Sequence, residues 1–471
     1  MGNKMLPVVH QKSILTEDAA NLGLLVFALK NILIPKIFIS LWLEKLSKKK
    51  KRYVHFDFNI APSKALNYLS NFQKITTHNF YPLIKFNKIE RKYKKDKNKS
   101  SRGVIKKKIR EIYYASHKDS LIYSWYAKIL DNFYEHVLST EEYKDSPTAY
   151  RKLGSKSNID FALEVFKHIK NQDESVVITV DIKQFFDKLD HKHLKQSWEL
   201  LLGEDILPQD HYKIYKSLTS FAFVEETELY KILKVKKNKR SYMTRLCSAE
   251  DFRSKVRDKG LIKTHEKKFG IPQGTPISSI LSNIYMQNFD KAIYEYLKHD
   301  TFLYKRYSDD IVIVCERKDK IKVIRMLKNE LKKIKLNLNP KKTNIILFKK
   351  GVKGISKGYS ENGEIVNLQY LGFDFDGENY FIRSSSISRY YTRLKSSIKA
   401  TVKNAKKSPN KIILKKNIYT KYSHLGERNF ISYAYQASQK MNSKNIKRQI
   451  KKHMKIIGSS IKENKTKYNL H

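Results

Sequence analysis

The feature that most constrains the fold is a short apolar segment that ends in an acidic residue. Residues 176–180 read Val-Val-Ile-Thr-Val, and Asp181 follows them directly. Five β-branched residues in succession favour a strand that is buried on both faces. A carboxylate at the end of such a strand lies where a core gives way to a cleft. The residues alone also allow a plainer interpretation, in which Asp181 caps the next helix.

A second apolar segment carries two adjacent acids. Within residues 302–314, two runs typical of strands flank Ser308-Asp309-Asp310, which predicts a hairpin with these three residues at its turn. An Asp in a turn is ordinary, but adjacent carboxylates between buried strands cost energy unless a cation neutralises them. If the two strand ends are neighbours, Asp181 and Asp309 can bind two divalent cations. Two metal ions about 3.5–4 Å apart activate a 3′-hydroxyl and stabilise a leaving pyrophosphate.

The charge balance indicates the partner of such a site. The 471 residues include 95 Lys and Arg against 46 Asp and Glu, so the formal net charge is +49. A charge of this size repels itself unless a polyanion compensates it, which argues against an enzyme of small neutral metabolites. The hydrophobic share of 41% is enough to build folded cores, so a fully disordered basic protein is disfavoured.

Three basic tracts flank the acidic centre: Lys48–Arg52, Lys85–Arg110 and Ala400–His471. Any one charge run is usually a solvated face. Their arrangement around clustered acids favours the walls of a channel for nucleic acid, with an affinity that falls as the salt concentration rises.

The cysteines and the apolar stretches bear on the cellular compartment. Cys247 and Cys315 are far apart and have no metal-ligand spacing, so we expect a reducing compartment, the cytoplasm. No pattern typical of a signal peptide is evident. The most apolar stretch, Asn21–Leu43, is interrupted by Lys30 and Pro35, whereas a membrane span needs about 20 apolar residues. Two core helices separated at Pro35 are favoured, and an interfacial membrane helix is the alternative.

Several motifs of this chain resemble those of reverse transcriptases. The segment Arg306–Asp310 is similar to their Tyr-x-Asp-Asp box, and Val180–Asp187 resembles their first catalytic motif. The segment Gly270–Asn283 is similar to their primer- and template-gripping motif, and this match is long and specific. Downstream, Leu336–Thr343 resembles a motif with a lysine near the nucleotide, and Leu368–Phe373 resembles the primer-grip hairpin.

The resemblance covers residues 100–380 and implies an α+β fold, that of a right-hand polymerase. Its fingers and palm would combine an antiparallel sheet with helices, and a helical C-terminal module would take the place of a thumb. We expect a helical and basic extension over residues 1–100 and the fingers and palm over 101–345. A primer-grip-like hairpin region over 346–384 and a basic helical module over 385–471 would follow.

The resemblance also implies a catalytic set. Asp181, Asp309 and Asp310 match the catalytic carboxylates, which would hold two Mg²⁺ ions, with Mn²⁺ as a substitute. Asp181 and Asp309 are the principal expected ligands, and the backbone carbonyl of Ile182 matches a position that completes the metal shell. Asp310 belongs to the same ligand set and is expected to shape the site more than it ligates.

Other positions match residues that contact the nucleotide. Phe186 lies where a bulky ring closes on the sugar C2′ and excludes a 2′-hydroxyl, which predicts a deoxynucleotide; a core aromatic is the alternative. Arg110 and Arg151 match positions in the fingers that face the triphosphate, the nucleotide or the template, although Arg110 also suits a basic strand edge. Gln273 would lie beneath the templating pair. Lys342 matches a proposed proton donor to pyrophosphate, and a solvated lysine fits nearly as well.

The residues expected to grip template and primer lie in the same motifs and are Gly274, Pro276, Tyr307, Leu371 and Gly372. Gly274 would permit close approach of the backbone. Farther along the first motif, His191 and His193 invite a metal-site interpretation, but the start of a helix is favoured.

Finer resemblances narrow the class of enzyme. No integrase, ribonuclease H or clear endonuclease domain is evident, so we do not expect autonomous mobility. The segments Cys247–Arg253 and Ser282–Met286 resemble bacterial reverse transcriptases of the abortive-infection and phage-defence type, which are related to retron and group II intron enzymes. The predicted function is therefore an RNA-directed DNA polymerase in antiviral defence.

The expected partners are an RNA or DNA template-primer and deoxynucleoside triphosphates, with no membrane. A dedicated non-coding RNA, a homo-oligomer, and template-independent or protein-primed synthesis all stay open. Three alternative functions also stay open: a non-catalytic RNA-binding scaffold, a retron-type reverse transcriptase and an RNA-synthesising polymerase. The intact Asp181, Asp309 and Asp310 argue against the scaffold, and Phe186 argues against RNA synthesis.

Overall fold

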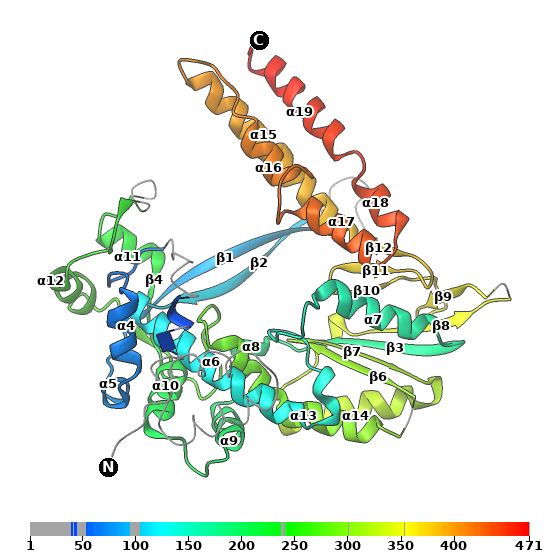
Figure 1. The fold of residues 1–471 in the computed structure, drawn as a ribbon, viewed down its shortest axis with the longest axis horizontal. Helices are drawn as coiled ribbons and strands as arrows, with labels where there is room; N and C mark the ends of the chain where they lie inside the picture. Colours follow the sequence, from blue (N-terminus) through cyan, green and yellow to red (C-terminus); the bar gives the residue numbers. More distant parts are fainter. Residues whose placement is uncertain are drawn as a thin grey trace, which may run out of the picture. The chain divides into compact units, whose positions relative to one another are not determined.

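The structure of the chain is a computed structural model that divides into two compact units (Figure 1). It describes residues 39–40, 42–44, 53–94, 104–236, 240, 242–299, 301–352 and 354–470. Unit 1 comprises Met1–Tyr150, Ile182–Glu295 and Leu327–Leu338, and unit 2 comprises Arg151–Asp181, Tyr296–Met326 and Asn339–His471. Three stretches of the sequence predictions lie outside the described residues: the basic tract Lys48–Arg52, most of the apolar stretch Asn21–Leu43, and residues 95–103.

Unit 1 contains a four-stranded sheet in the order β2-β1-β4-β5. Its strands are β1 (Leu83–Lys94), β2 (Val104–Tyr114), β4 (Ala222–Glu225) and β5 (Lys263–Thr264). β1 and β2 form a long antiparallel hairpin, and β4 runs parallel to β1. Ile84 and Val224 are register partners on β1 and β4, and both are fully buried in a core that also holds Phe56 and Phe252. The apolar base of the hairpin therefore anchors its basic outer part.

Most of the other elements of unit 1 are helices: α4 (Pro62–Leu69), α5 (Phe72–Thr76), α6 (His117–Ser139), α8 (Phe185–Lys188), α9 (His191–Leu202), α10 (Gln209–Thr219), α11 (Glu226–Ile232) and α12 (Ala249–Asp251). Unit 1 also contains a 3-10 turn (Glu142–Asp145) and a π-helical turn (Phe252–Arg257). Asp190 caps α9 by accepting a hydrogen bond from the amide of His193 at 3.0 Å. The predicted helix start at His191 and His193 is confirmed.

Unit 2 contains a five-stranded antiparallel sheet in the order β6-β7-β3-β8-β9. Its strands are β3 (Glu174–Asp181), β6 (Leu303–Tyr307), β7 (Asp310–Cys315), β8 (Asn344–Lys350) and β9 (Ser356–Tyr359). β3 lies at the centre, where Val176, Ile178 and Val180 are at most 3% exposed. The predicted buried strand is confirmed, and it includes Asp181 as its last residue. Two helices, α13 (Ser278–Leu297) and α14 (Lys320–Lys333), have residues in both units.

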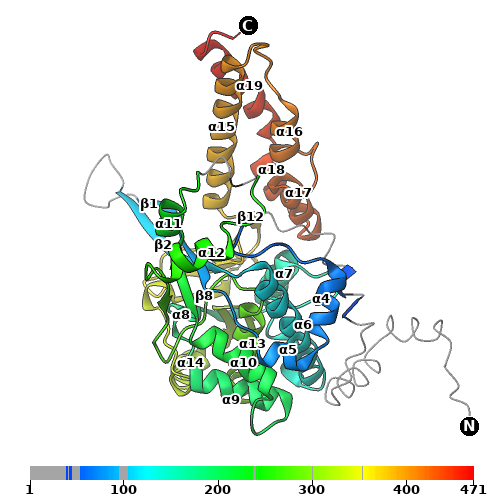
Figure 2. The same cartoon turned by 90° about the vertical axis from the view of Figure 1, so that its left-hand side faces the viewer.

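Unit 2 also contains a small antiparallel sheet and the C-terminal helices. The sheet is β10 (Leu368–Tyr370), β11 (Phe373–Phe375) and β12 (Tyr380–Ile382), and the helices are α7 (Asn158–Lys170), α15 (Ser384–Lys407), α16 (Lys416–Tyr422), α17 (Phe430–Lys440), α18 (Lys444–Ile450) and α19 (His453–Lys467). Within this unit α15 and α19 run side by side (Figure 2). Phe375 stacks on Phe166 of α7 at 4.9 Å between ring centroids and lies 5.6 Å from Phe348 of β8. A single core therefore joins both sheets and the C-terminal helices.

Among the residues that the structure describes, no helix combines the length and the apolar character needed to cross a membrane.

Candidate active site

The end of the central strand of unit 2 brings acidic residues together. β3 and β7 are antiparallel neighbours, and their register pairs Asp181 directly with Asp310. Directly paired residues point to the same face of a sheet, with Cβ atoms about 4.5–5.5 Å apart. Asp309 precedes Asp310 in the turn between β6 and β7. Two acidic segments that are more than 120 residues apart in the sequence thus meet at one edge of the sheet.

The turn that carries Asp309 is tight. Tyr307 pairs with Asp310, so the hairpin closes through only two residues, Ser308 and Asp309. Ser308 has a φ of 61°, a left-handed conformation that costs a residue with a Cβ atom about 1–3 kcal/mol. The fully buried Arg306 donates a hydrogen bond from Nη1 to the Ser308 carbonyl at 3.3 Å, which supports this conformation. The predicted three-residue turn is corrected to two residues, because Asp310 is already paired as the first residue of β7.

Asp181 is 7% exposed, and the segment before β8 contacts its carboxylate. Asn339 donates from Nδ2 to Asp181 Oδ2 at 3.2 Å, and its backbone amide donates to the Asp181 carbonyl at 2.8 Å. Lys342 forms an ion pair through Nζ with Asp181 Oδ1. The Lys342 amide donates to the Asn339 carbonyl at 3.0 Å, within a 3-10 turn over Pro340–Lys342. One short turn therefore orients both groups that hold the carboxylate.

The carboxyl group of Asp310 has a higher pKa than an isolated aspartate on a protein surface. Partial burial, followed by the negative charges of Asp309 and Asp181, raises the pKa of Asp310 to about 6. The cations Lys342 and Arg383 act on it in the opposite direction. The Asp310 side chain keeps an exposed surface, so solvent screens part of the repulsion. A divalent cation at this place would relieve the crowding of like charges and keep Asp310 ionised at lower pH.

These residues fit a magnesium site that substrate completes. Across the described part of the chain, no three His, Cys, Asp or Glu side chains converge closely enough to form a metal site by themselves. Mg²⁺ does not require this, because it commonly takes one or two carboxylates and fills its remaining positions with water and substrate phosphates. Asp181, Asp309 and Asp310 offer such carboxylates. Lys342 is the cation that a metal ion on Asp181 would replace.

Ile182, whose carbonyl was expected to complete the metal shell, begins the second stretch of unit 1. It forms an isolated antiparallel bridge with Leu338. The next amide, that of Lys183, donates to the Asn337 carbonyl at 2.9 Å. The backbone that follows Asp181 is therefore held by hydrogen bonds.

In unit 1, the ring expected at the sugar lies close in the fold to the template-gripping motif. Phe185 is buried at 3% exposure, whereas Phe186 is only half-buried, so Phe185 is the residue that fills the core. The Phe186 carbonyl accepts a hydrogen bond from the Ile271 amide at 3.0 Å. Gln273 donates from Nε2 to Asp187 Oδ1 at 2.8 Å. These two hydrogen bonds fix the segment that contains Phe186 and the segment that contains Gln273 relative to one another.

Position 274 requires a glycine because strand β2 of the β1–β2 hairpin approaches its backbone closely. Its φ is 113°, and an added Cβ atom would lie 2.6 Å from the Tyr113 carbonyl oxygen and 2.9 Å from Ile112 Cγ2. The Tyr113 amide donates to the Gln273 carbonyl at 2.7 Å. The close approach that glycine permits is thus made here by strand β2 of the protein itself. Pro276 is half-buried two residues before the start of α13.

The two arginines expected in the fingers have different surroundings. Arg110 on β2 forms an ion pair with Glu90 on β1, with 2.5 Å between Nη1 and Oε1, and both side chains are partly exposed. Arg151 is the first residue of unit 2. In unit 1, the segment just before it is fixed by Asn283, whose Nδ2 donates to the Ala149 carbonyl at 2.9 Å.

Comparison with known protein families decides the class of this chain. Residues 94–375, more than half of the chain, match the family described as Reverse transcriptase (RNA-dependent DNA polymerase). The chain belongs to the reverse transcriptase family. The predicted α+β polymerase fold and the predicted enzyme class, RNA-directed DNA polymerase, are confirmed at the level of the family.

Solved structures that resemble this reverse transcriptase include telomerases of two yeasts. Apo telomerase from Candida tropicalis, truncated from its C-terminal domain, is 16% identical, with 67% of this chain and 59% of that chain covered and a TM-score of 0.41. Telomerase from Candida albicans in complex with a TWJ fragment of telomeric RNA is 13% identical, with coverages of 85% and 65% and a TM-score of 0.40. The chain thus spans 59% and 65% of the lengths of these telomerase chains. No curated protein matches it.

The hairpin expected to grip the primer in this reverse transcriptase closes through Leu371 and Gly372. Their φ angles are 45° and 93°, and two successive positive values are typical of a type I′ turn. The Leu371 carbonyl accepts from Asn158 Nδ2 at 3.1 Å, and the Gly372 carbonyl accepts from the Arg383 amide at 3.0 Å. Side-chain and backbone donors therefore hold both turn residues. Tyr307, the remaining grip residue, is half-buried.

The sequence predictions assigned no role to three residues of this reverse transcriptase site: Asn339 and Arg306, which lie within the matched motifs, and Arg383. Asn339 contacts Asp181, and Arg306 supports the turn. Burial raises the pKa of both Asp310 and Asp374, and the charge of Arg383 opposes that rise. The dipeptide Asn339-Pro340 is a turn signal, but it does not indicate a partner.

Proposed function

We propose that the chain is an RNA-directed DNA polymerase that joins deoxynucleotides by two-metal nucleotidyl transfer. The observation that carries the proposal is the register of β3 and β7, which pairs Asp181 with Asp310 and leaves Asp309 in the adjoining turn. Membership of the reverse transcriptase family supports the reaction class. Crowded carboxylates are unfavourable unless a cation joins them, and a divalent cation is also the partner that a triphosphate requires.

In this proposal, Asp181 and Asp309 hold two Mg²⁺ ions, for which Mn²⁺ can substitute, and Asp310 and the carbonyl of Ile182 complete the set. When bound, the metal ions activate the 3′-hydroxyl and neutralise charge on the leaving pyrophosphate. Asn339 orients the Asp181 carboxylate through its 3.2 Å hydrogen bond. Lys342 forms an ion pair with Asp181 when no metal is bound, and a metal ion on Asp181 would free its ammonium group to donate a proton to pyrophosphate.

Further residues would contact the nucleotide and the strands. Phe186 excludes the 2′-hydroxyl, Gln273 lies under the templating pair, and Arg110 and Arg151 contact phosphate or template. The grip on template and primer is assigned to Gly274, Pro276, Tyr307, Leu371 and Gly372. The C-terminal helices α15–α19 carry most of the basic tract Ala400–His471 and would hold the nucleic acid, with an affinity that falls as salt rises.

A role in bacterial phage defence is a finer part of the proposal. It is supported by the sequence likeness of Cys247–Arg253 and Ser282–Met286 to enzymes of that type, and by the helical module after Arg383. Sequencing the nucleic acid that co-purifies with the protein, together with the DNA made in vitro, tests it. A resident RNA, or DNA without a template copy, is the expected finding. If the protein copied every added template equally well, the proposal of a dedicated defence reaction would be contradicted.

The test of the polymerase proposal is an incorporation assay. Purified protein, with any co-purifying RNA, receives each labelled nucleotide and Mg²⁺. We expect incorporation of deoxynucleotides, and none with Asp309→Ala. Incorporation of ribonucleotides only would contradict the proposal of a DNA polymerase. If the wild type made no product and Asp309→Ala bound nucleic acid as the wild type does, a non-catalytic RNA-binding scaffold would be favoured.

Phe186 offers a test of sugar selection. We expect Phe186→Ala to raise the ratio of ribonucleotide to deoxynucleotide incorporation by about tenfold or more, because removing the ring opens space at the 2′ position. Phe186→Tyr retains the ring and should keep the wild-type ratio. An unchanged ratio in Phe186→Ala would remove Phe186 from this role.

A further inference from the structure

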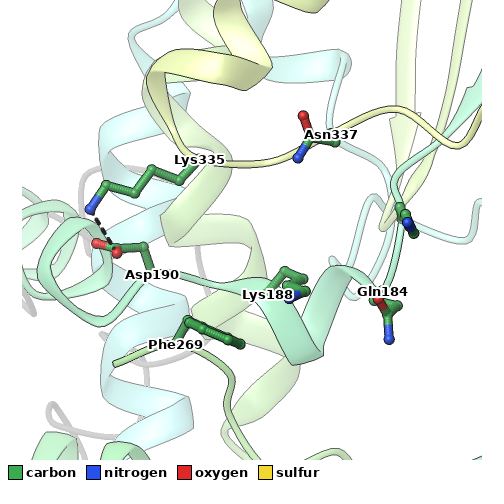
Figure 3. A pocket seen from close by; sticks show the side chains of 7 residues that line it. Gln184, Lys188, Asp190, Phe269, Lys335 and Asn337 are labelled. Atoms are coloured by element: carbon green, nitrogen blue, oxygen red, sulfur yellow. Dashed lines mark hydrogen bonds and ion pairs between the residues drawn. The ribbon is translucent and has the colours of Figure 1, made fainter. Parts of the chain in front are cut away.

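Unit 1 contains a charged cavity, and none of its lining residues has been assigned to nucleotidyl transfer. Its volume is about 390 Å³, and it is lined by Lys183, Gln184, Lys188, Asp190, Phe269, Lys335 and Asn337 (Figure 3). Three lysines face one aspartate, so the cavity carries an excess of positive charge. The ring of Phe269 forms part of its wall between Lys188 and Asp190.

The walls of this cavity are joined by backbone hydrogen bonds. The Gly270 amide donates to the Leu189 carbonyl at 2.8 Å, and the His191 amide donates to the Lys268 carbonyl at 3.0 Å. These bonds attach the segment on both sides of Phe269 to the segment that runs from α8 into α9. The bond between Lys183 and Asn337 attaches the third wall. The cavity therefore has a fixed frame.

Two of the three ammonium groups are held in place. Lys188 Nζ lies 4.4 Å from the ring centroid of Phe269, within the range of a cation–π interaction. Lys335 Nζ lies 2.8 Å from Asp190 Oδ2, as the dashed line in Figure 3 shows. Asp190 Oδ1 also caps α9 through the His193 amide, so this carboxylate is itself anchored. Lys188 and Lys335 thus have defined positions on the cavity wall.

Two lining residues have an unfavourable backbone. Gln184 and Lys335 have φ angles of 51° and 55°, in the left-handed region that residues with a Cβ atom rarely adopt. Residues in such conformations concentrate at active sites and ligand-binding sites. Gln184 and Asn337 both lie on the side of the cavity away from the lysine–aspartate pair, and their amides can donate further hydrogen bonds (Figure 3).

We propose that this cavity binds a pyrophosphate group, either as free pyrophosphate or as the tail of a nucleoside triphosphate. An anion with several charges matches three lysines around one small cavity, and the amides of Gln184 and Asn337 complete the donors. A nucleic-acid strand is a poorer match, because its phosphates follow one another along a track and call for a basic groove.

The proposal rests on the proposed function only in the choice of anion, since nucleotidyl transfer consumes a triphosphate and releases pyrophosphate. The test is therefore a direct binding measurement that needs no synthesis. Inorganic pyrophosphate, and separately a deoxynucleoside triphosphate, are titrated into the full chain with a chelator present, so that the metal site does not contribute. The variant is Lys188→Gln with Lys335→Gln, and the matched control is Lys192→Gln, an exposed lysine on α9 outside the lining.

We expect the double variant to bind pyrophosphate or the triphosphate at least tenfold more weakly, because a hydrogen bond to a charged group contributes about 1.5–3 kcal/mol. A loss for both ligands assigns the cavity to the shared phosphate group. A loss for the triphosphate alone assigns it to incoming nucleotide, and a loss for pyrophosphate alone assigns it to the product. Lys192→Gln and Asp309→Ala should both bind like the wild type.

Two results would overturn the proposal. One is an unchanged affinity in the double variant, or an equal loss in Lys192→Gln, which would show that only overall charge matters. The other is a tenfold loss of single-stranded oligonucleotide binding with unchanged pyrophosphate binding, which would make the cavity part of a strand path. Because Asp309→Ala removes synthesis and not the cavity, failure of the polymerase proposal would be seen separately.

Discussion

The acidic site of unit 2 and the basic cavity of unit 1 hold their charges in opposite ways. In the acidic site, Asp310 lies beside two other carboxylates, and burial, together with their repulsion, raises its pKa. In the basic cavity, Lys188 and Lys335 each have their own partner, the ring of Phe269 and the carboxylate of Asp190. A divalent cation would thus stabilise the acidic site, whereas the lysines of the cavity are positioned before any anion binds.

The largest expected effect is the loss of the acidic site. Asp309→Ala should lower the rate of synthesis by at least about 10³-fold, because metal ions supply several kcal/mol of transition-state stabilisation. Nucleic-acid affinity should stay within about twofold, since an acid contributes little attraction for phosphate. Single-turnover synthesis and a binding titration measure the two quantities.

Asp173→Ala is the matched control for that variant. Asp173 lies one residue before β3, and its side chain is 93% exposed. It should leave synthesis unchanged. Near-normal synthesis by Asp309→Ala would show that Asp309 is not a metal ligand.

The next effect concerns Lys342, which forms an ion pair with Asp181. Lys342→Met should slow the chemical step by about 10²-fold, the smallest contribution usual for a positioned general acid. It should also tighten Mg²⁺ binding, because the metal no longer competes with the ammonium group. Lys341→Met, at the neighbouring position, should change neither quantity. Weaker Mg²⁺ binding in Lys342→Met would contradict the competition.

A smaller effect is the pH dependence of stability that Asp310 confers. Its pKa of about 6 lies above the ordinary value of 3.8, so between these pH values the folded chain keeps a proton that the unfolded chain has lost. Without metal, the contribution of Asp310 to stability must therefore fall as pH rises from about 4 to 6. Asp310→Asn removes this dependence and should melt a degree or two higher than the wild type at pH 7.5 in a chelator.

Thermal melting at pH 4, 6 and 7.5, with chelator and with Mg²⁺, measures this difference. Added Mg²⁺ should stabilise the wild type more than Asp310→Asn. Identical pH profiles for the two proteins would mean that the carboxylates are not crowded in solution.

The smallest expected effect tests how the basic cavity is organised. Phe269→Leu removes the ring under Lys188, and an exposed cation–π contact contributes about 0.5–1 kcal/mol. Pyrophosphate should bind about two- to fivefold more weakly, and Phe269→Tyr should restore the wild-type affinity. Equal weakening in both variants would indicate that Phe269 acts through packing alone.

Local patterns predicted the elements that carry the acidic site. A run of β-branched residues gives β3, two apolar runs that flank adjacent acids give the hairpin, and Asp190 before His191 gives the start of α9. Each depends on interactions between residues close in sequence, which are written in the residue types themselves. The long match of Gly270–Asn283 to a family motif added the polymerase class.

Contacts between distant segments could not be predicted in this way. Asn339 reaches Asp181 across 158 residues, and a turn signal at Asn339 says nothing about what the turn contacts. The left-handed φ of Ser308 is equally hidden, because serine seldom adopts it. The lysines of the basic cavity are three among many in a chain of net charge +49. Only the fold distinguishes them, through Phe269 and Asp190.

The central position of β3 has a consequence for how the chain is made. Both of its neighbours, β7 and β8, come later in the sequence, the nearer one beginning at Asp310. At a synthesis rate of about 5–20 residues per second, the apolar strand waits roughly 6–30 s on the ribosome before its first partner is complete. During that interval it is an unpaired hydrophobic edge, the kind of segment that chaperones bind. Yield in the cell should therefore depend on holding β3 apart until the Asp309 hairpin emerges.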